Sequence, residues 1–124
     1  MIFMFQKEVA ERIFSKPNSK NYSRISVMIQ TFCNIDLKYN ISKNVFYPKP
    51  KVDSCIIKLK KKGTTLDLKE YAIFIKSAFR QKRKKIKNNL NGIINEDGLK
   101  ILGDRRPQDI NIEEYINIFR NYIL

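Results

Sequence analysis

The hydrophobic pattern of this chain changes once, at Gly63, and this change constrains the fold more than any other feature. After Gly63-Thr64-Thr65 every apolar pattern has helical spacing. Before it, strand-like stretches at 1–5, 35–41 and 52–59 are interspersed with helix-like stretches at 7–14 and 22–32. Strands mixed with helices are typical of an α/β domain, whereas helices alone form a bundle. We therefore expect an α/β part over residues 1–62 and a helical part over residues 63–124.

The first five residues, Met1-Ile2-Phe3-Met4-Phe5, are apolar at every position. This pattern is typical of a central parallel strand that is buried on both faces. A helix is expected to follow directly, over 7–14, so that the two form the start of a βα unit. Such a strand needs neighbours, because alone it would be an aggregation-prone edge. We therefore expect this strand to belong to a larger sheet that extends beyond this chain.

The charge of the chain favours a polyanionic partner. Lys and Arg number 25 against 12 Asp and Glu, a formal net charge of +13. Such an excess suits RNA, DNA or an anionic membrane surface. The bases are concentrated in residues 76–87, which contain no acid. If residues 72–90 form one helix, these bases lie beside its apolar face and could follow a phosphate backbone. A solvated basic face is the alternative, and a membrane-surface helix is less favoured.

Cysteine and histidine usage excludes several kinds of chemistry. Cys33 and Cys55 are the only cysteines and there is no histidine, so neither a four-ligand zinc site nor a histidine base can be built. We expect no metal, and we expect both cysteines to be small apolar residues in a reducing compartment. The apolar start is too short for a signal peptide or a membrane span, which predicts a soluble, cytoplasmic protein.

The proline loop, residues 46–51, is the most informative local motif. It reads Phe46-Tyr47-Pro48-Lys49-Pro50-Lys51 and leads into the strand expected at 52–59. Each proline restricts the residue before it to extended backbone, so a stiff loop should project Phe46 and Tyr47 beside Lys49 and Lys51. An aromatic ring among cations suits stacking on a base beside phosphates. The alternative is that the prolines only end a strand and Phe46 packs in the core. Spacing alone does not decide between the two.

Five segments of the chain, taken together, carry a resemblance to a known family. They are residues 6–13, 19–30 and 46–54, the stretch Ala78–Lys85 with Asn89-Leu90, and Arg106-Pro107 before Glu113-Glu114-Tyr115. In this order and spacing they resemble the C-terminal half of the bacterial small-subunit rRNA adenine dimethyltransferases, nearly from end to end. Erythromycin-resistance methyltransferases share the proline loop. The segment at 22–24 and Arg106-Pro107 resemble the small-subunit enzymes better.

The resemblance implies the C-terminal part of a Rossmann-like methyltransferase sheet followed by a small all-helical domain. It implies an S-adenosylmethionine-dependent, monomeric enzyme of ribosome biogenesis that dimethylates N6 of two adjacent adenosines near the 3′ end of 16S rRNA in the small subunit. The family's Gly-rich cofactor loop, its acidic ribose ligand and its Asn-Leu-Pro-Tyr-type motif are absent. All four glycines, Gly63, Gly92, Gly98 and Gly103, lie in the helical half. The chain is therefore expected to be a fragment that is inactive alone.

The resemblance also assigns candidate site residues. Phe46 matches the aromatic residue that stacks on the flipped target adenine. Lys49 and Lys51 would hold phosphates beside it, and a larger basic set would dock rRNA: Arg80, Lys82, Arg83, Lys84, Lys85 and Lys87. For Gln6, Lys7, Glu8 and Arg24, which lie in matching segments, a structural role is at least as well supported. The alternative for the whole chain is a stand-alone basic RNA-binding or ribosome-binding module without catalysis.

Overall fold

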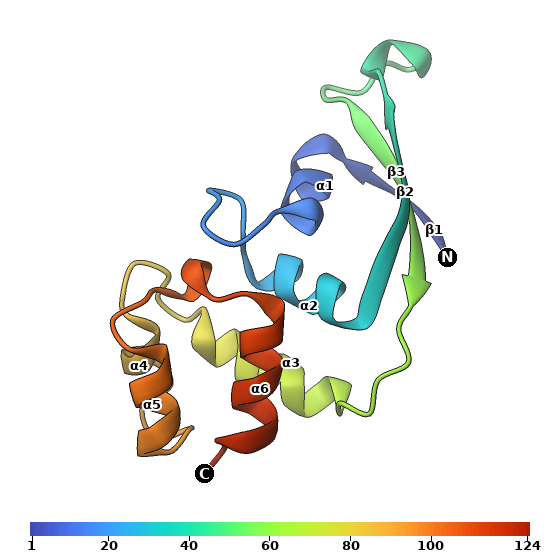
Figure 1. The fold of residues 1–124 in the computed structure, drawn as a ribbon. Coiled ribbons are helices and arrows are strands. Elements are labelled where there is room, and N and C mark those ends of the chain that lie inside the picture. Colours follow the sequence, from blue (N-terminus) through green and yellow to red (C-terminus); the bar gives the residue numbers. More distant parts are fainter.

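The computed structural model describes residues 1–36 and 38–124 and has a mixed α/β part followed by helices (Figure 1). The first part contains β1 (Ile2–Gln6), α1 (Lys7–Phe14), α2 (Arg24–Phe32), β2 (Cys33–Ile41) and β3 (Ser54–Lys61). The second contains α3 (Leu68–Ala78), α4 (Ile86–Asn89), α5 (Glu96–Leu102) and α6 (Ile112–Asn121). Single 3-10 turns span Lys43–Val45 and Pro107–Asp109. The predicted change from mixed to helical elements after Gly63 is confirmed.

The three strands form an antiparallel sheet in the order β1-β3-β2. The prediction that residues 1–5 form a central parallel strand buried on both faces is therefore wrong for this structure. β1 pairs antiparallel with β3 and lies at the edge of the sheet. Phe5 is partly buried, but Ile2 is 70% and Met4 58% exposed. An apolar run indicates a strand but says nothing about the direction or number of its neighbours, which are set by distant segments.

The helices α1 and α2 cover one face of the sheet (Figure 1). The buried cluster between them consists of Ala10, Ile13, Cys55, Ile57 and Leu59. Alternation along β3 produces this arrangement, because Cys55, Ile57 and Leu59 point to the covered face while Lys58 and Lys60 are exposed. The predicted role of Cys55 as a small buried apolar residue is confirmed. Cys33 is partly buried, and both thiols are free.

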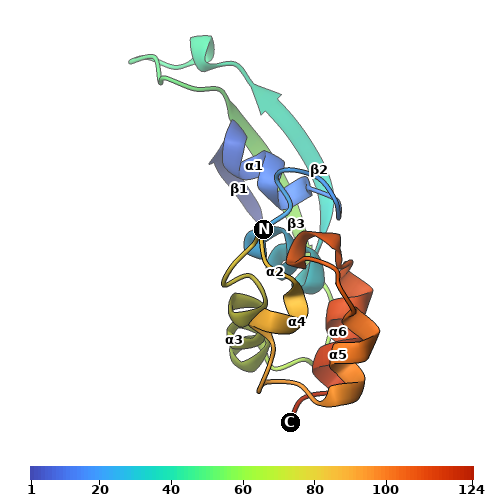
Figure 2. The same cartoon turned by 90° about the vertical axis from the view of Figure 1, so that its left-hand side faces the viewer.

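A second, larger cluster fills the helical part and includes α2. Tyr22, two residues before α2, and Val27 within it share this cluster with Tyr71, Phe74 and other buried residues of the later helices and their connections. The helix α2 thus lies between the sheet and the helical part (Figure 2). The helix α6 is capped by Asn111, whose Oδ1 atom accepts a hydrogen bond of 2.8 Å from the Glu114 N–H.

Residues 72–90 do not form one helix, so the condition for a basic stripe along a helix is not met. α3 ends at Ala78, α4 begins at Ile86, and the residues between them form turns. The side-chain amide of Asn89 donates to the carbonyl oxygens of Ala78 and Gln81, at 2.9 and 3.1 Å. In a continuous helix the Ala78 carbonyl would accept from residue 82 instead. Repulsion between closely spaced bases also disfavours a continuous helix. The cations of this region therefore lie on a turn and do not form a helical stripe.

Replacing Tyr22 by phenylalanine should lower the free energy of unfolding by about 1–2 kcal/mol. The Tyr22 hydroxyl donates a buried hydrogen bond of 2.7 Å to the carbonyl of Ile110, and its loss leaves that acceptor without its partner. Urea denaturation of both proteins measures the change. Tyr39→Phe is the matched control, since Tyr39 is 64% exposed. Equal stability of the two variants would contradict the prediction.

Candidate nucleic-acid interface

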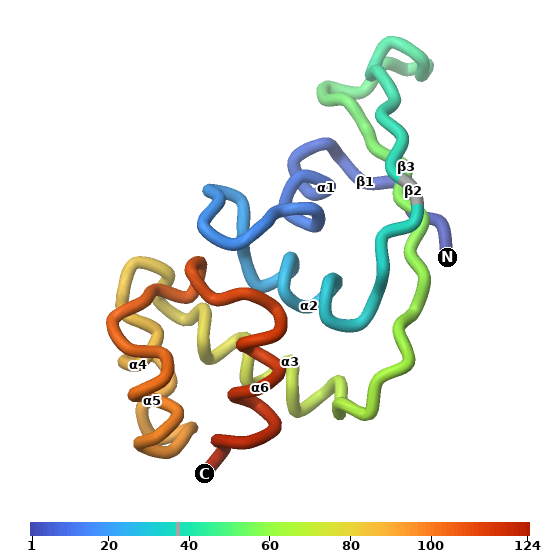
Figure 3. Tube along the Cα trace, in the orientation of Figure 1, coloured from blue at the N-terminus to red at the C-terminus, as the bar shows by residue number. Residues whose placement is uncertain are grey.

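The proline loop lies at the tip of the connection between β2 and β3, which extends away from the helical part (Figures 1 and 3). Tyr47 is fully exposed, and Phe46 is partly buried and belongs to neither buried cluster of the described residues. The aromatic pocket, a small cavity of about 290 Å³, is lined by Met4, Phe46, Tyr47, Pro48, Pro50 and Ser54. Phe46 is therefore not a core residue and lines an accessible, mainly apolar cavity.

The base of this connection is fixed by two contacts of Asp53, one through its side chain and one through its backbone. The Asp53 carboxylate accepts a hydrogen bond of 2.8 Å from the Lys43 N–H, which ties the two sides of the connection together. The Asp53 carbonyl accepts from the Lys7 N–H at 2.9 Å, which ties it to the start of α1. Lys7 is thus positioned to hold the loop through its backbone, whereas its side chain is exposed.

Two residues of the aromatic pocket, Met4 and Ser54, lie outside the proline loop. Ser54 is the first residue of β3 and follows the loop closely in the chain. Met4 reaches the pocket because β1 pairs with β3 in the register that sets Met4 opposite Ile56. A local motif does not encode this long-range pairing, so the sequence gives no signal for Met4. Lys49 and Lys51 are exposed beside this pocket, and neither forms an ion pair with a described residue.

The basic segment, residues 80–87, contains cations that pair with the distant acid Asp104 and cations that have no such partner. Lys85 and Lys87 both contact the Asp104 carboxylate, at 3.3 and 2.9 Å. Hydrogen bonds from Lys87 and then Lys85 lower the pKa of Asp104 below its ordinary value. The candidates without an ion-pair partner in the described part of the chain are Arg80, Lys82, Arg83 and Lys84. Of these, Lys82 donates to the carbonyl oxygen of Lys20 at 3.2 Å.

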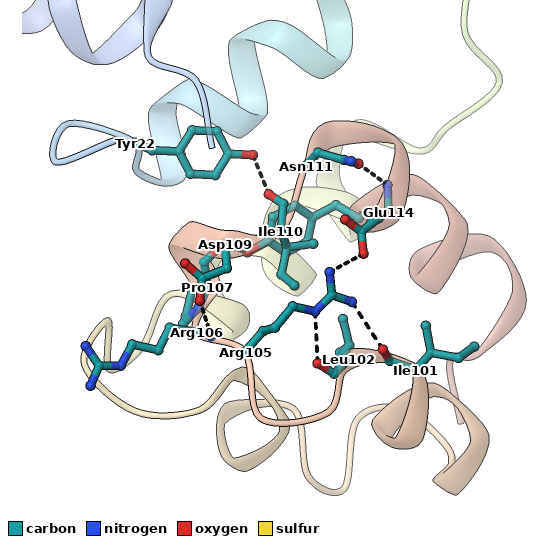
Figure 4. Close-up of polar contacts among 11 residues, drawn as sticks. Tyr22, Ile101, Leu102, Arg105, Arg106, Pro107, Asp109, Ile110, Asn111 and Glu114 are labelled. Atoms are coloured by element: carbon teal, nitrogen blue, oxygen red, sulfur yellow. Dashed lines mark hydrogen bonds and ion pairs between the residues drawn. The ribbon is translucent and has the colours of Figure 1, made fainter. Parts of the chain in front are cut away.

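The Arg106-Pro107 segment is part of a structural cluster that ties α5 to α6 (Figure 4). The guanidinium of the preceding residue, Arg105, donates to the carbonyls of Ile101 and Leu102, both at 3.1 Å. It also forms an ion pair of 2.6 Å with Glu114. Since these groups satisfy one another, we assign them to the fold.

The buried tyrosines are structural hydrogen-bond donors. The Tyr115 hydroxyl donates to the Pro107 carbonyl at 2.6 Å, and burial raises the pKa of Tyr115 well above its ordinary value. Burial also raises the pKa of Tyr71 to about 12, although its hydrogen bond with Thr31 acts in the opposite direction. These phenols therefore remain protonated at neutral pH and are unsuited to accept a proton from a substrate.

The residues present do not fit S-adenosylmethionine. Binding of such a nucleoside needs close backbone approach at a glycine-rich turn and a carboxylate for the ribose. Here β1 passes directly into α1 without an intervening residue, and the first glycine is Gly63, beyond the sheet. Within residues 1–36 and 38–124, no group of three or more His, Cys, Asp or Glu could hold a metal ion. Nor does that part of the chain contain a helix long and apolar enough to cross a membrane.

Solved structures place the fold in a class. A dimethyladenosine transferase from Plasmodium falciparum matches with a TM-score of 0.83 and 24% identity, over 94% of this chain and 54% of that chain. The 23S rRNA methyltransferase ErmE matches with a TM-score of 0.64 and 21% identity, over 96% of this chain and 52% of that chain. The chain therefore has a fold found in adenosine and rRNA methyltransferases.

The sequence defines the family within this class. The family described as "Ribosomal RNA adenine dimethylase" matches residues 1–123, and the chain belongs to it. A ribosomal RNA small subunit methyltransferase A from Thermotoga neapolitana is 38% identical over 119 residues, which are 95% of this chain and 45% of the relative. That from Borreliella afzelii is 42% identical over 125 residues, 95% of this chain and 44% of the relative. The chain thus spans less than half the length of these two curated relatives.

Proposed function

We propose that this chain is the rRNA-contacting, C-terminal part of a small-subunit rRNA adenine dimethyltransferase. In combination with a cofactor-binding part, it would act on N6 of two adjacent adenosines near the 3′ end of 16S rRNA. In this proposal the enzyme is a cytoplasmic monomer, residues 1–62 complete its α/β domain and residues 63–124 form its helical domain. The aromatic pocket around Phe46 is the observation that carries the proposal.

The chemistry of the aromatic pocket suits an extruded adenine. A purine presents two flat π faces, and stacking on an aromatic side chain contributes about 1–3 kcal/mol per base. The Phe46 ring would supply that face, while the side chains of Met4 and Pro50 would exclude water from the edges of the base. A base must leave its stack before an enzyme can reach its exocyclic amino group, and such a pocket would hold it outside the RNA.

The cations would position the rRNA. Lys49 and Lys51 stand beside the aromatic pocket and would contact phosphates next to the extruded base. Arg80, Arg83 and Lys84 are exposed on the turn after α3, and Lys82 lies beside them. Lys85 and Lys87 would contribute less, because each must exchange Asp104 for a phosphate.

A cofactor-binding part would join the protein at β1. The outer edge of this strand carries no partner strand within the described chain, and the exposed side chains of Ile2, Phe3 and Met4 are apolar. A further strand would satisfy its unpaired backbone groups. The length of the relatives also supports such a part. The family depends on S-adenosylmethionine, and the methyl donor would bind to the part that supplies the missing site.

The second candidate function is a basic RNA-binding module without catalysis. The poor fit of the residues present to the cofactor favours it, since RNA contacts through the basic segment require no methyl donor. The two candidates differ in one measurable property, which is methyl transfer in the presence of a cofactor-binding part.

The deciding experiment measures methyl transfer from labelled S-adenosylmethionine to undermethylated small ribosomal subunits. We expect no transfer by this chain alone and transfer when the cofactor-binding part of a family relative is added. That part without this chain is the control. Transfer by the chain alone would contradict our conclusion about the cofactor. RNA binding without transfer in the combined sample would favour the binding module.

A further inference from the structure

A second cavity, the basic groove, lies between the start of α2 and the end of α3. Its volume is about 510 Å³. Its lining includes Ser23, Arg24, Lys76, Phe79, Arg80 and Lys82. They come from two segments about fifty residues apart in the sequence, so no local sequence motif predicts the groove. It is separate from the aromatic pocket, with which it shares no residue.

The charge of the basic groove is entirely positive. Four cations, Arg24, Lys76, Arg80 and Lys82, line it, and no acidic residue of the described chain does so. None of the four forms an ion pair with another described residue. By contrast, Lys85 and Lys87 are held by Asp104 outside the groove. Cations gathered around one concave surface repel each other until an anion binds among them.

The groove also contains an unused hydrogen-bonding group. Ser23 forms a capping box with Ser26, in which its side chain faces the Ser26 N–H, but the proton of its buried Oγ atom has no acceptor among the described residues. A buried hydroxyl proton without an acceptor costs about 1–3 kcal/mol, which an acceptor in the groove would recover. Ser23 is the N-cap residue of α2, a helix of nine residues whose first turn carries no acid. The partial positive charge at this helix end adds to that of the side chains.

The walls of the basic groove are held in place before any ligand binds. The Phe79 ring packs against Tyr22 and Tyr115, with ring centroids 6.4 and 5.8 Å apart. The contact of Lys82 with the Lys20 carbonyl fixes the turn after α3 to the connection before α2. A preformed site spends little conformational entropy on binding.

We propose that the basic groove binds a phosphodiester of the RNA backbone. Arg24 and Arg80 donate to the phosphate oxygens in their planar, two-pronged geometry, Lys76 and Lys82 add charge, and Ser23 Oγ donates from below. Phe79 gives the adjoining sugar an apolar surface. The inference rests on the proposed function for the identity of the polyanion, and it assigns Ser23, Arg24 and Lys76 to a second RNA contact.

The test compares Arg24→Gln and Lys76→Gln with the unchanged chain in binding to a fluorescent 16S rRNA fragment, followed by anisotropy at several salt concentrations. Each variant should bind about 3- to 10-fold more weakly at low salt. Each should also reduce the slope of log K against log salt by about 0.7–0.9, the value of one lost phosphate contact. Arg120→Gln is the control, because Arg120 is an exposed arginine of α6 outside the groove.

The outcomes separate this inference from the proposed function. If Arg24→Gln and Arg120→Gln have the same slope and affinity, or if the chain binds no RNA, the groove is not a phosphate site. Methyl transfer by the combined protein would then still support the dimethyltransferase. Weaker binding of the groove variants without any methyl transfer would support the groove and refute the enzyme. Circular dichroism confirms that each variant is folded.

Discussion

Methyl transfer by the combined protein falls by about 5- to 150-fold when Phe46 is replaced by alanine, if its ring stacks on the target adenine. This range is the kinetic equivalent of the 1–3 kcal/mol that aromatic stacking contributes per base. Affinity for 16S rRNA should change by less than about threefold, because the cations that contact phosphates remain. Initial rates with labelled methyl donor and anisotropy with the same RNA give the two quantities.

Two further variants make the Phe46 result specific. Phe46→Tyr keeps a flat aromatic face in the aromatic pocket and should retain most of the transfer rate. Tyr39→Ala removes an exposed aromatic ring outside the pocket and should have no effect on transfer. If Phe46→Ala lowered RNA affinity as much as the transfer rate, Phe46 would be a general RNA contact and not the residue that holds the reacting base.

Replacing Asn89 by leucine should lower the free energy of unfolding by about 2–3 kcal/mol, a loss of about 30- to 150-fold in the folding equilibrium. The side chain is only 7% exposed, and its amide donates both of its hydrogens, to the carbonyls of Ala78 and Gln81. Leucine has nearly the same size but no donor, so both acceptors lose their partner. Urea denaturation measures the change.

Asn88→Leu is the control for Asn89, since Asn88 is the neighbouring residue of the same helix and is exposed. It should alter stability by less than about 0.5 kcal/mol. Similar losses for both variants would show that the amide bonds of Asn89 do not hold the turn after α3. The Asn89 variant should also weaken RNA binding, because Arg80 and Lys82 are on that turn.

Local patterns predicted the elements well because each pattern is set by its own segment. The helix over 7–14 was predicted with its observed bounds, and the strand expected at 52–59 begins two residues later, at Ser54. The cap of α6 is likewise local, since Asn111 and Glu114 are three residues apart. The Glu114 side chain is paired with Arg105.

The errors concern arrangements that distant residues decide. Residues 1–5 read as a parallel strand because their pattern carries no information on direction, which the pairing with β3 fixes. A single helix over 72–90 is compatible with the spacing of the apolar residues Phe79 and Ile86, which flank the basic segment, but residues 80–85 contain no apolar residue. The amide of Asn89 and the repulsion of neighbouring cations favour a turn there. Predicted roles for Phe46 and the cations remain predictions.

The same reason limits what sequence reveals about the candidate site. The proline loop identifies Phe46 by itself, but Met4 joins the aromatic pocket through strand register. Arg24 joins the basic groove because α2 packs beside α3. Arg24 lies in a segment that resembles the family and Met4 lies just before one, and neither stretch alone indicates which distant residues it contacts.

The position of α2 in both buried clusters has a consequence for substrate selection. Ile25 and Ile29 of this helix pack against the sheet cluster, while Val27 belongs to the helical cluster. Because this helix packs against both the sheet and the helical part, we expect the aromatic pocket and the basic groove to keep a nearly constant separation and orientation. An RNA that fills both must already present an unstacked base and a phosphate at that spacing. Folded rRNA offers such a fixed arrangement, whereas a flexible strand of the same sequence must lose entropy to adopt it. Discrimination would then depend on the tertiary shape of the RNA more than on its nucleotide sequence.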